Sequence, residues 1–402
     1  MKTDEIIQTE KNVVLGTYSR PPFVLTHGKG VYLFDENGKK YLDFIAGIAV
    51  NALGHADEGA LKALKEQADK LWHCSNLYYT EPQVKVARLL TDNTFADKVF
   101  FCNSGAEAIE GAIKIARKWA KTNKGEQTFE IIAFRNSFHG RTMGAISATG
   151  QPKFWQGFEP MLDGFLFATF NDLDSVRELV TPGTCAVLVE PIQGESGIYP
   201  AEKEFLQGLR QLCDANNCLL IFDEIQCGLG RTGTFSAYEQ YDVQPDIMAV
   251  AKPIANGLPM GAILMTDEAA APIGVGNHGS TFGGGPLVTA VADYVLRQIL
   301  APQFLSHVRR MSDYLLQKLE VLRSEYADRI LAVRGTGLMC GIELDADPKA
   351  VIDACVKNGL LVCKAGNNTL RFLPPLIVET EHIDEAIDIL QRALEETAEA
   401  NE

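Results

Sequence analysis

The pattern of apolar and polar positions predicts alternating strands and helices from about Asp97 onward. Six short apolar runs, each followed by polar or turn-forming residues, are typical of buried strands. They are Val99–Cys102, Ile131–Phe134, Cys185–Val189, Cys218–Phe222, Ile247–Val250 and Ala262–Met265. Helical patterns lie between them, at Glu107–Lys121, Asp174–Val180 and Glu202–Asn216. This alternation predicts an α/β fold, with a mainly parallel central sheet covered by helices on both faces.

Other elements are predicted on both sides of that region. Val31–Phe34 and Lys40–Phe44 flank an Asn-Gly turn, which is a strong hairpin signal. Apolar residues recur at helical spacing within Ala56–Leu71. Toward the C-terminus we expect helices at Pro286–Leu300, Phe304–Glu325, Pro348–Lys357 and Glu381–Glu396, and strands at Gly337–Leu344 and Leu370–Leu373.

These elements suggest three parts. Residues 1–55 would be an N-terminal segment that packs with the small domain. Residues 56–302 would form the large sheet domain, and residues 303–402 a smaller α+β domain.

Composition and charge restrict the classes of function. Hydrophobic residues make up 46% and charged residues 22% of the chain, as in an ordinary globular protein. The 37 Lys and Arg residues are outnumbered by 52 Asp and Glu residues, giving a net charge of −15 without a basic run, which argues against nucleic-acid binding. No apolar run approaches the roughly 18 residues of a membrane span, and the N-terminus lacks the features of a signal or transit peptide. The nine cysteines contain no Cys-x-x-Cys pair. We therefore expect a cytoplasmic protein with free thiols and no metal site.

Candidate chemistry lies just after the strands, because open α/β sheets bind ligands beyond the carboxyl ends of their strands. Ser104 and Glu107 follow the first strand as a capping box, so a helix should begin there. Gly105 would let a ligand approach the free amides of the helix N-terminus, which suits a phosphate. An ordinary helix start would have the same residues.

The next two strands are followed by aromatic and acidic residues. Phe138 and His139 beside Arg141 could supply a stacking face and a carboxylate clamp, although a buried Phe and a surface Arg are common. Glu190 and Glu195 could be an acid/base pair, could mask an arginine, or could be solvated loop acids.

The fourth and fifth strands are followed by an acid and an amine. Asp223 comes after five apolar residues, and a buried carboxylate needs a partner, either an arginine or a protonated pyridine nitrogen. Lys252 directly follows an apolar strand, and Pro253 should bias it toward an extended backbone. A desolvated lysine has a lowered pKa and can attack an aldehyde, whereas a snorkelling surface lysine is the alternative. The glycine-rich turn Gly279–Gly285 could offer hydroxyls to a phosphate or be a flexible connection.

Together the strand ends supply a phosphate cradle, a stacking face, an acid for a pyridine nitrogen and an amine for an aldehyde. That set matches the needs of pyridoxal phosphate. From about Tyr18 to Leu390 the chain resembles the class III, or ornithine-type, aminotransferases of the fold-type-I group. The resemblance rests on Phe101–Ala108, Phe138–Arg141, Glu190–Glu195, Phe222–Gln226, Gly228–Gly233 and Leu370–Phe372. Two further segments, Ser75–Gln83 and His278–Gly284, are most similar to the acetylornithine-type members, which act in arginine biosynthesis.

The resemblance implies that pyridoxal phosphate binds in the large domain. Lys252 would hold the cofactor through its amine, and Asp223 would pair with the ring nitrogen. The other cofactor-binding residues implied are Ser104, Gly105, Ala106, Phe138, Glu224, Ile225 and Gln226. Thr281 would reach a phosphate held by the neighbouring subunit, so the resemblance implies a homodimer with shared active sites.

The resemblance also implies the substrates. Arg141 and Ser280 would hold the α-carboxylate side of acetylornithine, with Tyr18 shaping the pocket. Arg371 would bind the α-carboxylate of glutamate or 2-oxoglutarate, and Glu195 would neutralise Arg371 when the other donor reacts. The implied reaction moves the δ-amino group of N2-acetylornithine to 2-oxoglutarate by a ping-pong mechanism. Succinylornithine, ornithine and γ-aminobutyrate aminotransferases share most of these residues and are the alternatives.

The chain departs from the family pattern after the lysine. Many members have a glycine run there, whereas Lys252–Pro259 reads Lys-Pro-Ile-Ala-Asn-Gly-Leu-Pro and keeps only Gly257. Ser196 replaces a frequent glycine, and Gly285 a common asparagine. A more distant alternative is a nicotinamide-dependent dehydrogenase, because Gly228–Gly233 matches the dinucleotide fingerprint. That fingerprint should directly follow a strand and open a helix, which the flanking residues do not favour.

Overall fold

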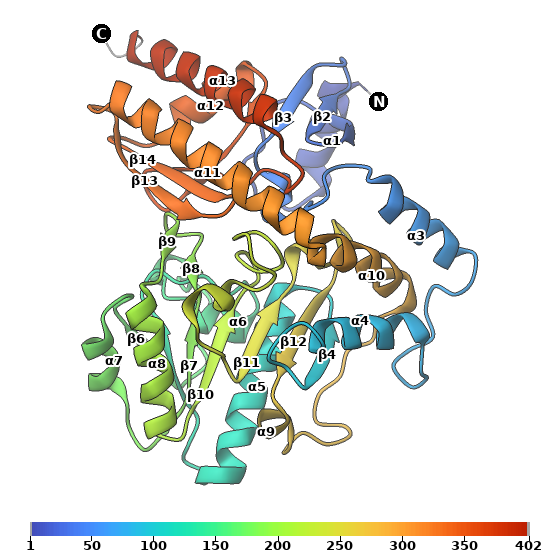
Figure 1. Cartoon of the computed structure of the whole chain (residues 1–402), viewed down its shortest axis with the longest axis vertical. Coiled ribbons are helices and arrows are strands. Elements are labelled where there is room, and N and C mark those ends of the chain that lie inside the picture. The colour runs from blue at the N-terminus through green and yellow to red at the C-terminus, as the bar shows by residue number, and fades with distance from the viewer. Residues whose placement is uncertain (1, 400–402) are drawn as a thin grey trace.

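The computed structural model describes residues 2–399, and its centre is a seven-stranded sheet in the order β4-β12-β11-β10-β7-β5-β6 (Figure 1). The strands are β4 (Lys98–Cys102), β5 (Glu130–Phe134), β6 (Phe165–Ala168), β7 (Thr184–Val189), β10 (Leu219–Asp223), β11 (Ile247–Val250) and β12 (Gly261–Met265). The six predicted runs are confirmed, each to within one residue at either end. Neighbouring strands are parallel except for β12, which is antiparallel to both β11 and β4. The predicted α/β fold with a mainly parallel sheet is confirmed.

The sequence pattern missed β6 and the direction of β12. β6 is a four-residue edge strand that pairs only with β5, so tertiary pairing decides its existence. The connection from β11 to β12 spans only residues 251–260 and contains the short 3₁₀ helix η3 (Lys252–Ala255). A parallel crossover needs about a dozen residues or more, so the chain turns back and β12 runs antiparallel.

Helices cover both faces of this sheet, and strand alternation explains why both faces are apolar. Ile221 of β10 packs in the same cluster as residues of α5 (Gly105–Lys124). Its neighbours Leu220 and Phe222 face the opposite cluster, which includes residues of α8 (Lys203–Ala215). The other elements of this part are α6 (Met143–Ala148), α7 (Leu173–Leu179), α9 (Asp267–Ala270), η1 (Pro152–Phe154), η2 (Ala237–Tyr241), β8 (Ile192–Gln193) and β9 (Tyr199–Pro200).

The N-terminal hairpin shares a sheet with the end of the chain. β1 (Leu25–Lys29), β2 (Tyr32–Asp35) and β3 (Lys40–Asp43) form an antiparallel meander, and β3 pairs in parallel with β15 (Leu360–Leu361). A third sheet has the order β13-β14-β17-β16. Its strands are β13 (Ile330–Thr336), β14 (Met339–Leu344), β16 (Cys363–Ala365) and β17 (Thr369–Phe372). The predicted hairpin is confirmed, whereas β13 was missed; the boundaries of the three parts stay a proposal.

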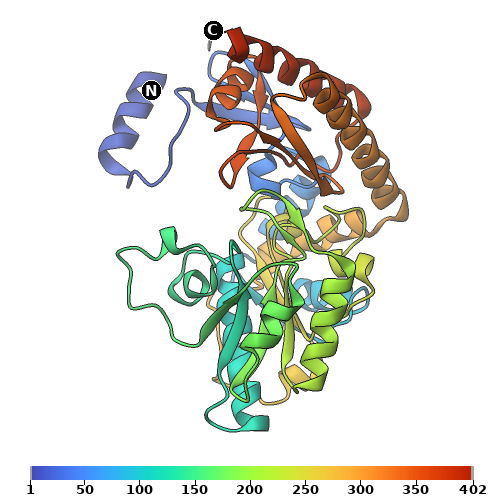
Figure 2. The ribbon, with the colours of Figure 1, turned by 90° about the vertical axis from the view of Figure 1, so that its left-hand side faces the viewer.

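The long C-terminal helices follow their predicted ranges closely. They are α10 (Pro286–Leu300), α11 (Pro302–Glu325), α12 (Lys349–Lys357) and α13 (Thr380–Glu399). The N-terminal half adds α1 (Thr3–Val13), α2 (Ala46–Ala49), α3 (Glu58–Ala68) and α4 (Glu81–Thr91). α1 buries none of its residues and stands apart from the rest of the ribbon in Figure 2. Within residues 2–399, no helix is long and apolar enough to cross a bilayer, and no group of His, Cys, Asp or Glu side chains is arranged to hold a metal.

Candidate active site

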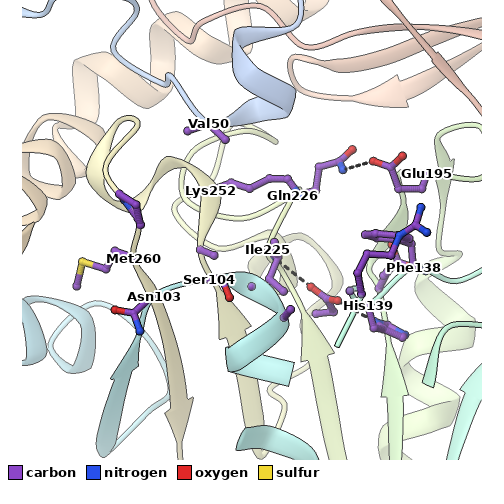
Figure 3. Close-up of a pocket in the computed structure, with 18 of the residues that line it drawn as sticks. Val50, Asn103, Ser104, Phe138, His139, Glu195, Ile225, Gln226, Lys252 and Met260 are labelled. Carbon is purple, nitrogen blue, oxygen red and sulfur yellow. Dashed lines mark hydrogen bonds and ion pairs between the residues drawn. The ribbon is translucent and has the colours of Figure 1, made fainter. Parts of the chain in front are cut away.

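A cavity of about 440 Å³ opens where the carboxyl ends of the central strands meet the N-terminus of α5 (Figure 3). Its size is that of a small-molecule site. Ten of the predicted site residues line it: Ser104, Gly105, Ala106, Phe138, Arg141, Glu195, Asp223, Ile225, Gln226 and Lys252. The fold therefore gathers at one sheet edge residues that are spread over much of the chain.

Lys252 projects into this cavity from the start of η3 and is half-buried. Burial lowers the pKa of its ammonium, and the negative charges of Glu195 and Asp223 oppose that effect only in part. A lowered pKa increases the fraction of neutral, nucleophilic amine. The expectation that Pro253 keeps Lys252 extended is wrong. Pro253 is accommodated in the first turn of η3, where a missing N–H removes no helical hydrogen bond.

Asp223, the last residue of β10, is buried and held in one orientation. Its Oδ2 lies 2.7 Å from Nδ1 of His139, and its Oδ1 accepts the backbone N–H of Ile225 at 3.0 Å. A carboxylate only accepts, so Nδ1 of His139 carries the shared hydrogen. Nε2 of His139 is buried without a partner among residues 2–399. The sequence interpretation treated His139 only as a possible stacking ring, and nothing local indicates its bond to a residue 84 positions away.

Glu190 lies beside Asp223 as a second buried acid. Burial raises the pKa of Glu190 well above its usual range, and the charge of Asp223 raises it further. Both effects favour the neutral form of the Glu190 carboxyl. Its Oε2 accepts the backbone N–H of Phe138 at 3.0 Å, so this side chain holds the predicted stacking residue in place.

The N-terminus of α5 forms one wall of the cavity. Ser104 caps the helix as predicted, its Oγ accepting the N–H of Glu107 at 3.2 Å. The predicted capping box is incomplete, because Glu107 instead accepts both the backbone and the side-chain N–H of Asn103, each at 2.9 Å. A Cβ on Gly105 would lie 2.8 Å from Ile225. A larger residue would press on Ile225 in the cavity wall, so glycine fits this first turn, whose amides have no helical partner.

Arg371 of β17 lies behind the cavity wall, where it pairs with Glu195, which lines the cavity. Nη1 of Arg371 donates to Oε1 of Glu195 at 2.6 Å and to Oε1 of Gln226 at 3.1 Å. Burial acts to raise the pKa of Glu195, but the charge and hydrogen bond of Arg371 outweigh it and the pKa is lowered. Burial likewise opposes the charged form of Arg371, yet its partners raise its pKa above the usual value. The ion pair that the family resemblance implied is present, and its role as a switch stays a prediction.

Arg141 is stacked rather than paired. Its guanidinium lies 3.8 Å from the ring centre of Phe154 and 5.5 Å from that of Phe138. In the part of the chain that the structure describes, no carboxylate forms an ion pair with it, so its donors are available to a ligand. The sequence interpretation did not include Phe154, whose position beside Arg141 depends on the fold.

Five predicted residues do not line the cavity: Arg371, which meets it through Glu195, and Glu224, Ser280, Thr281 and Tyr18. The Glu224 carboxylate accepts the backbone N–H groups of Ala237 and Tyr238, both at 2.7 Å, and does not line the cavity, so its cofactor-binding role stays a prediction. Ser280 and Thr281 line a neighbouring hollow, although Ser280 is linked to the cavity because its Oγ accepts from Asn103 at 3.2 Å. Tyr18 is 75% exposed. The predicted roles of Ser280, Thr281 and Tyr18 are not tested by a single chain.

The unusual loop after Lys252 is tied to the N-terminal segment. Asn256 adopts a left-handed conformation (φ 46°, ψ 45°). Its side chain accepts the N–H of Leu53 at 2.8 Å and donates to the carbonyl of Gly54 at 3.0 Å. Val50, which belongs to the same N-terminal segment, lines the cavity. Asparagine tolerates the left-handed backbone region better than most residues, so the loop can adopt this turn although it lacks the glycine run.

The residues present fit pyridoxal phosphate: an amine of lowered pKa, a fixed carboxylate, an aromatic wall and an open helix N-terminus converge on one cavity. With the topology of the central sheet, they define a fold-type-I enzyme that depends on pyridoxal phosphate. The chain belongs to the class-III aminotransferase family, whose model matches residues 16–394. The alternative of a nicotinamide dehydrogenase is therefore wrong.

Relatives and solved structures agree with this assignment. The chain is 46% identical to the acetylornithine aminotransferase of Clostridium acetobutylicum, over 96% of this chain and 99% of that protein. It is 45% identical to that of Methanocaldococcus jannaschii, over 98% and 99%. Among solved structures, the ornithine aminotransferase of Toxoplasma gondii superposes with a TM-score of 0.95 at 31% identity, covering 100% and 96% of the two chains. The N-acetylornithine aminotransferase of Stenotrophomonas maltophilia gives 0.86 at 37% identity, covering 98% and 100%.

Proposed function

We propose that this protein transfers the δ-amino group of N2-acetylornithine to 2-oxoglutarate, giving N-acetylglutamate semialdehyde and glutamate, a step of arginine biosynthesis. The observation that carries the proposal is the Arg371–Glu195 pair, because its glutamate lines the cavity that also holds Lys252 and Asp223. The names of the relatives at 45–47% identity support the same donor.

Bound pyridoxal phosphate supplies an aldehyde that condenses with amines and a ring that withdraws electrons from the reacting carbon. The residues that would hold it are the free amides of Gly105 and Ala106 for the phosphate and Phe138 for one ring face. Asp223 would accept the hydrogen of the ring nitrogen and keep that nitrogen protonated. His139 and the N–H of Ile225 hold the Asp223 carboxylate in the orientation that this task needs.

Lys252 would have two successive tasks. Its neutral Nζ would hold the cofactor between turnovers and would be set free when a donor amine takes its place. The freed Nζ would then accept a proton from the amine-bearing carbon of the donor and return it on the other side of the nitrogen, two atoms further along. The lowered pKa of Lys252, which burial causes, favours the neutral form that can act as this base.

Arg371 and Glu195 would let one pocket serve two substrates. The δ-end of acetylornithine carries no carboxylate, so the paired guanidinium presents little net charge to it. Glutamate carries an α-carboxylate at its reacting carbon, and this group would take Arg371 from Glu195 through a two-pronged contact. The stacked guanidinium of Arg141 would hold the carboxylate at the far end of the substrate.

We also propose a cytoplasmic homodimer in which Ser280 and Thr281 complete the neighbour's site. Large apolar side chains close to these residues are exposed in the single chain. Leu77 is 84%, Tyr78 68% and Phe282 66% exposed. Such a patch favours burial against a second copy.

A panel of half-reactions tests the donor. Purified protein loaded with cofactor is mixed with acetylornithine, succinylornithine, ornithine or γ-aminobutyrate, and the cofactor absorbance is followed by stopped flow. Acetylornithine should give the highest second-order rate constant. A tenfold or greater preference for ornithine or γ-aminobutyrate would overturn the proposed donor while leaving the family assignment intact.

A further inference from the structure

Arg231 is a buried cation that the chemistry above does not use. It lies in the turn Gly228–Gly233, and its side chain is among the largest that are fully buried. Within residues 2–399, no carboxylate pairs with its guanidinium, and Nη2 has no hydrogen-bond partner. Burying a charge without a counter-ion costs free energy, because the charge loses its hydration. An apolar side chain of the same volume would avoid this cost but could donate no hydrogen bond.

The guanidinium of Arg231 holds two segments of the small domain at once. Its Nη1 donates to the backbone carbonyls of Leu338 at 2.9 Å and Pro374 at 2.6 Å. The N–H of Leu338 donates in return to the carbonyl of Arg231 at 2.9 Å. Gly337 packs so closely against the turn that a Cβ there would lie 2.3 Å from the same carbonyl oxygen. The turn after β10 is thus joined to the small domain by direct backbone contact and by one side chain.

The two carbonyls mark one end of the ladder that carries Arg371. β14 and β17 are antiparallel, and Gly341 lies opposite Arg371. Leu338 lies three residues before Gly341, and Pro374 lies three residues after Arg371, so both carbonyls belong to the same end of the ladder. At about 3.3 Å per residue, this end is roughly 10 Å from Arg371 along the strand. The position of this end of the ladder determines where Arg371 lies relative to the cavity.

We propose that Arg231 is a positioning residue for Arg371. By donating hydrogen bonds at the ends of β14 and β17, Arg231 aligns Arg371, the carboxylate-binding arginine of the small domain, with the cavity of the large domain. The inference rests on the proposed function of Arg371 as the site for the α-carboxylate of glutamate. Methionine would fill the volume of Arg231 but could not hold two carbonyls. Lysine would keep a cationic donor on a shorter, more flexible stem.

The first test compares the half-reactions of Arg231→Met and Arg231→Lys in the cofactor-loaded enzyme. For Arg231→Met, the glutamate concentration at half-maximal rate should rise about tenfold, with the limiting rate changed less than about threefold. The acetylornithine half-reaction should change less than about threefold, and Arg231→Lys should recover part of the loss. Equal losses with both substrates would overturn the inference.

Arg309→Met is the matched control. Arg309 lies on α11, and within residues 2–399 its guanidinium donates to the carbonyl of Gly233 in the same turn and to Oγ of Ser306, not to Leu338 or Pro374. The variant Arg309→Met therefore removes an arginine contact to this turn and leaves the contacts of β14 and β17 unchanged. Both half-reactions of this variant should match the wild type; a selective loss for glutamate would show that any loosening of the turn has the same effect, and would overturn the specific role of Arg231.

A double-mutant cycle separates positioning from general damage. In an Arg371→Ala background, Arg231→Met should add less than about a twofold further loss with glutamate, because its effect passes through Arg371. An additive loss would overturn the inference. If Arg231→Met does not fold, Arg231→Lys replaces it in the cycle, and failure of both to fold would assign Arg231 to folding alone. A wild-type enzyme that does not react with glutamate at all would instead refute the proposed function, and this inference with it.

Discussion

The pair formed by Arg371 and Glu195 allows a sharp prediction for the variant Glu195→Gln. The amide keeps the size of the carboxylate and can still accept a hydrogen bond, but the charge that neutralises Arg371 is lost. In the wild type, the α-carboxylate of glutamate must compete with Glu195 for the guanidinium. In the variant this competitor is neutral. We therefore expect glutamate to bind more tightly and acetylornithine, whose reacting end is cationic, to react more slowly.

The magnitude follows from the geometry of the pair. Arg371 is 2% exposed, so water screens the interaction weakly. Two unit charges about 4 Å apart attract by about 4 kcal/mol at an effective dielectric constant of about 20. The substrate carboxylate restores most of this attraction when it replaces Glu195. A net change of about 1–3 kcal/mol is left, which corresponds to roughly 5- to 150-fold in the preference for glutamate over acetylornithine.

Stopped-flow half-reactions with each substrate measure this preference directly. The ratio of the second-order rate constant for glutamate to that for acetylornithine should rise in Glu195→Gln. The control is Glu343→Gln, which removes the carboxylate of the Arg334–Glu343 ion pair in the same small sheet, away from the cavity. That control should leave the ratio unchanged. A Glu195→Gln variant in which both rate constants fall by the same factor would refute the switch.

Four further predictions concern single side chains. Lys252→Ala should lose the absorbance of the protein-bound aldehyde and all measurable turnover; near-normal activity would rule out its assignment. Asp223→Asn should retain cofactor but lower the rate by roughly 100- to 1000-fold, the scale of losing one electrostatic partner in an enclosed site, and unchanged kinetics would count against its pairing with the ring nitrogen. Asn256→Ala should lower the free energy of unfolding by about 1–3 kcal/mol in a denaturant titration, through two lost hydrogen bonds and a strained left-handed alanine. Asn256→Gly should lose less, and an equal loss would remove the strain argument. Burial raises the pKa of Glu224 from its ordinary 4.5 to about 8, so the folded state binds the extra proton and wild-type stability falls as pH rises between those values. Glu224→Gln should flatten that decline in a series of melting temperatures, and a decline as steep as that of the wild type would contradict the argument.

Local pattern was enough to predict the elements that carry the site. A buried strand needs only a run of apolar residues and a turn at its end, so all six predicted strands were found within one residue of their positions. The carboxyl ends of parallel strands share one edge, which is why Asp223 and Lys252 could be expected in one cavity. Even there, the backbone at Lys252 was predicted wrongly, because the bias that proline exerts on its predecessor yields to a short 3₁₀ turn.

The partners of these residues were decided by the tertiary structure alone. His139 meets Asp223 across 84 positions, and the Arg371–Glu195 contact, which only the family resemblance implied, spans 176. Glu224, adjacent to Asp223, points away, because successive side chains at a strand end face opposite sides. Hydrogen bonds and burial depend on which surfaces meet when the sheets pack. The residues of two such surfaces are far apart in the sequence, so a short segment of the chain does not contain both. The amino-acid sequence by itself therefore determined which chemical groups stand at the edge of the sheet, and packing decided how each one is held.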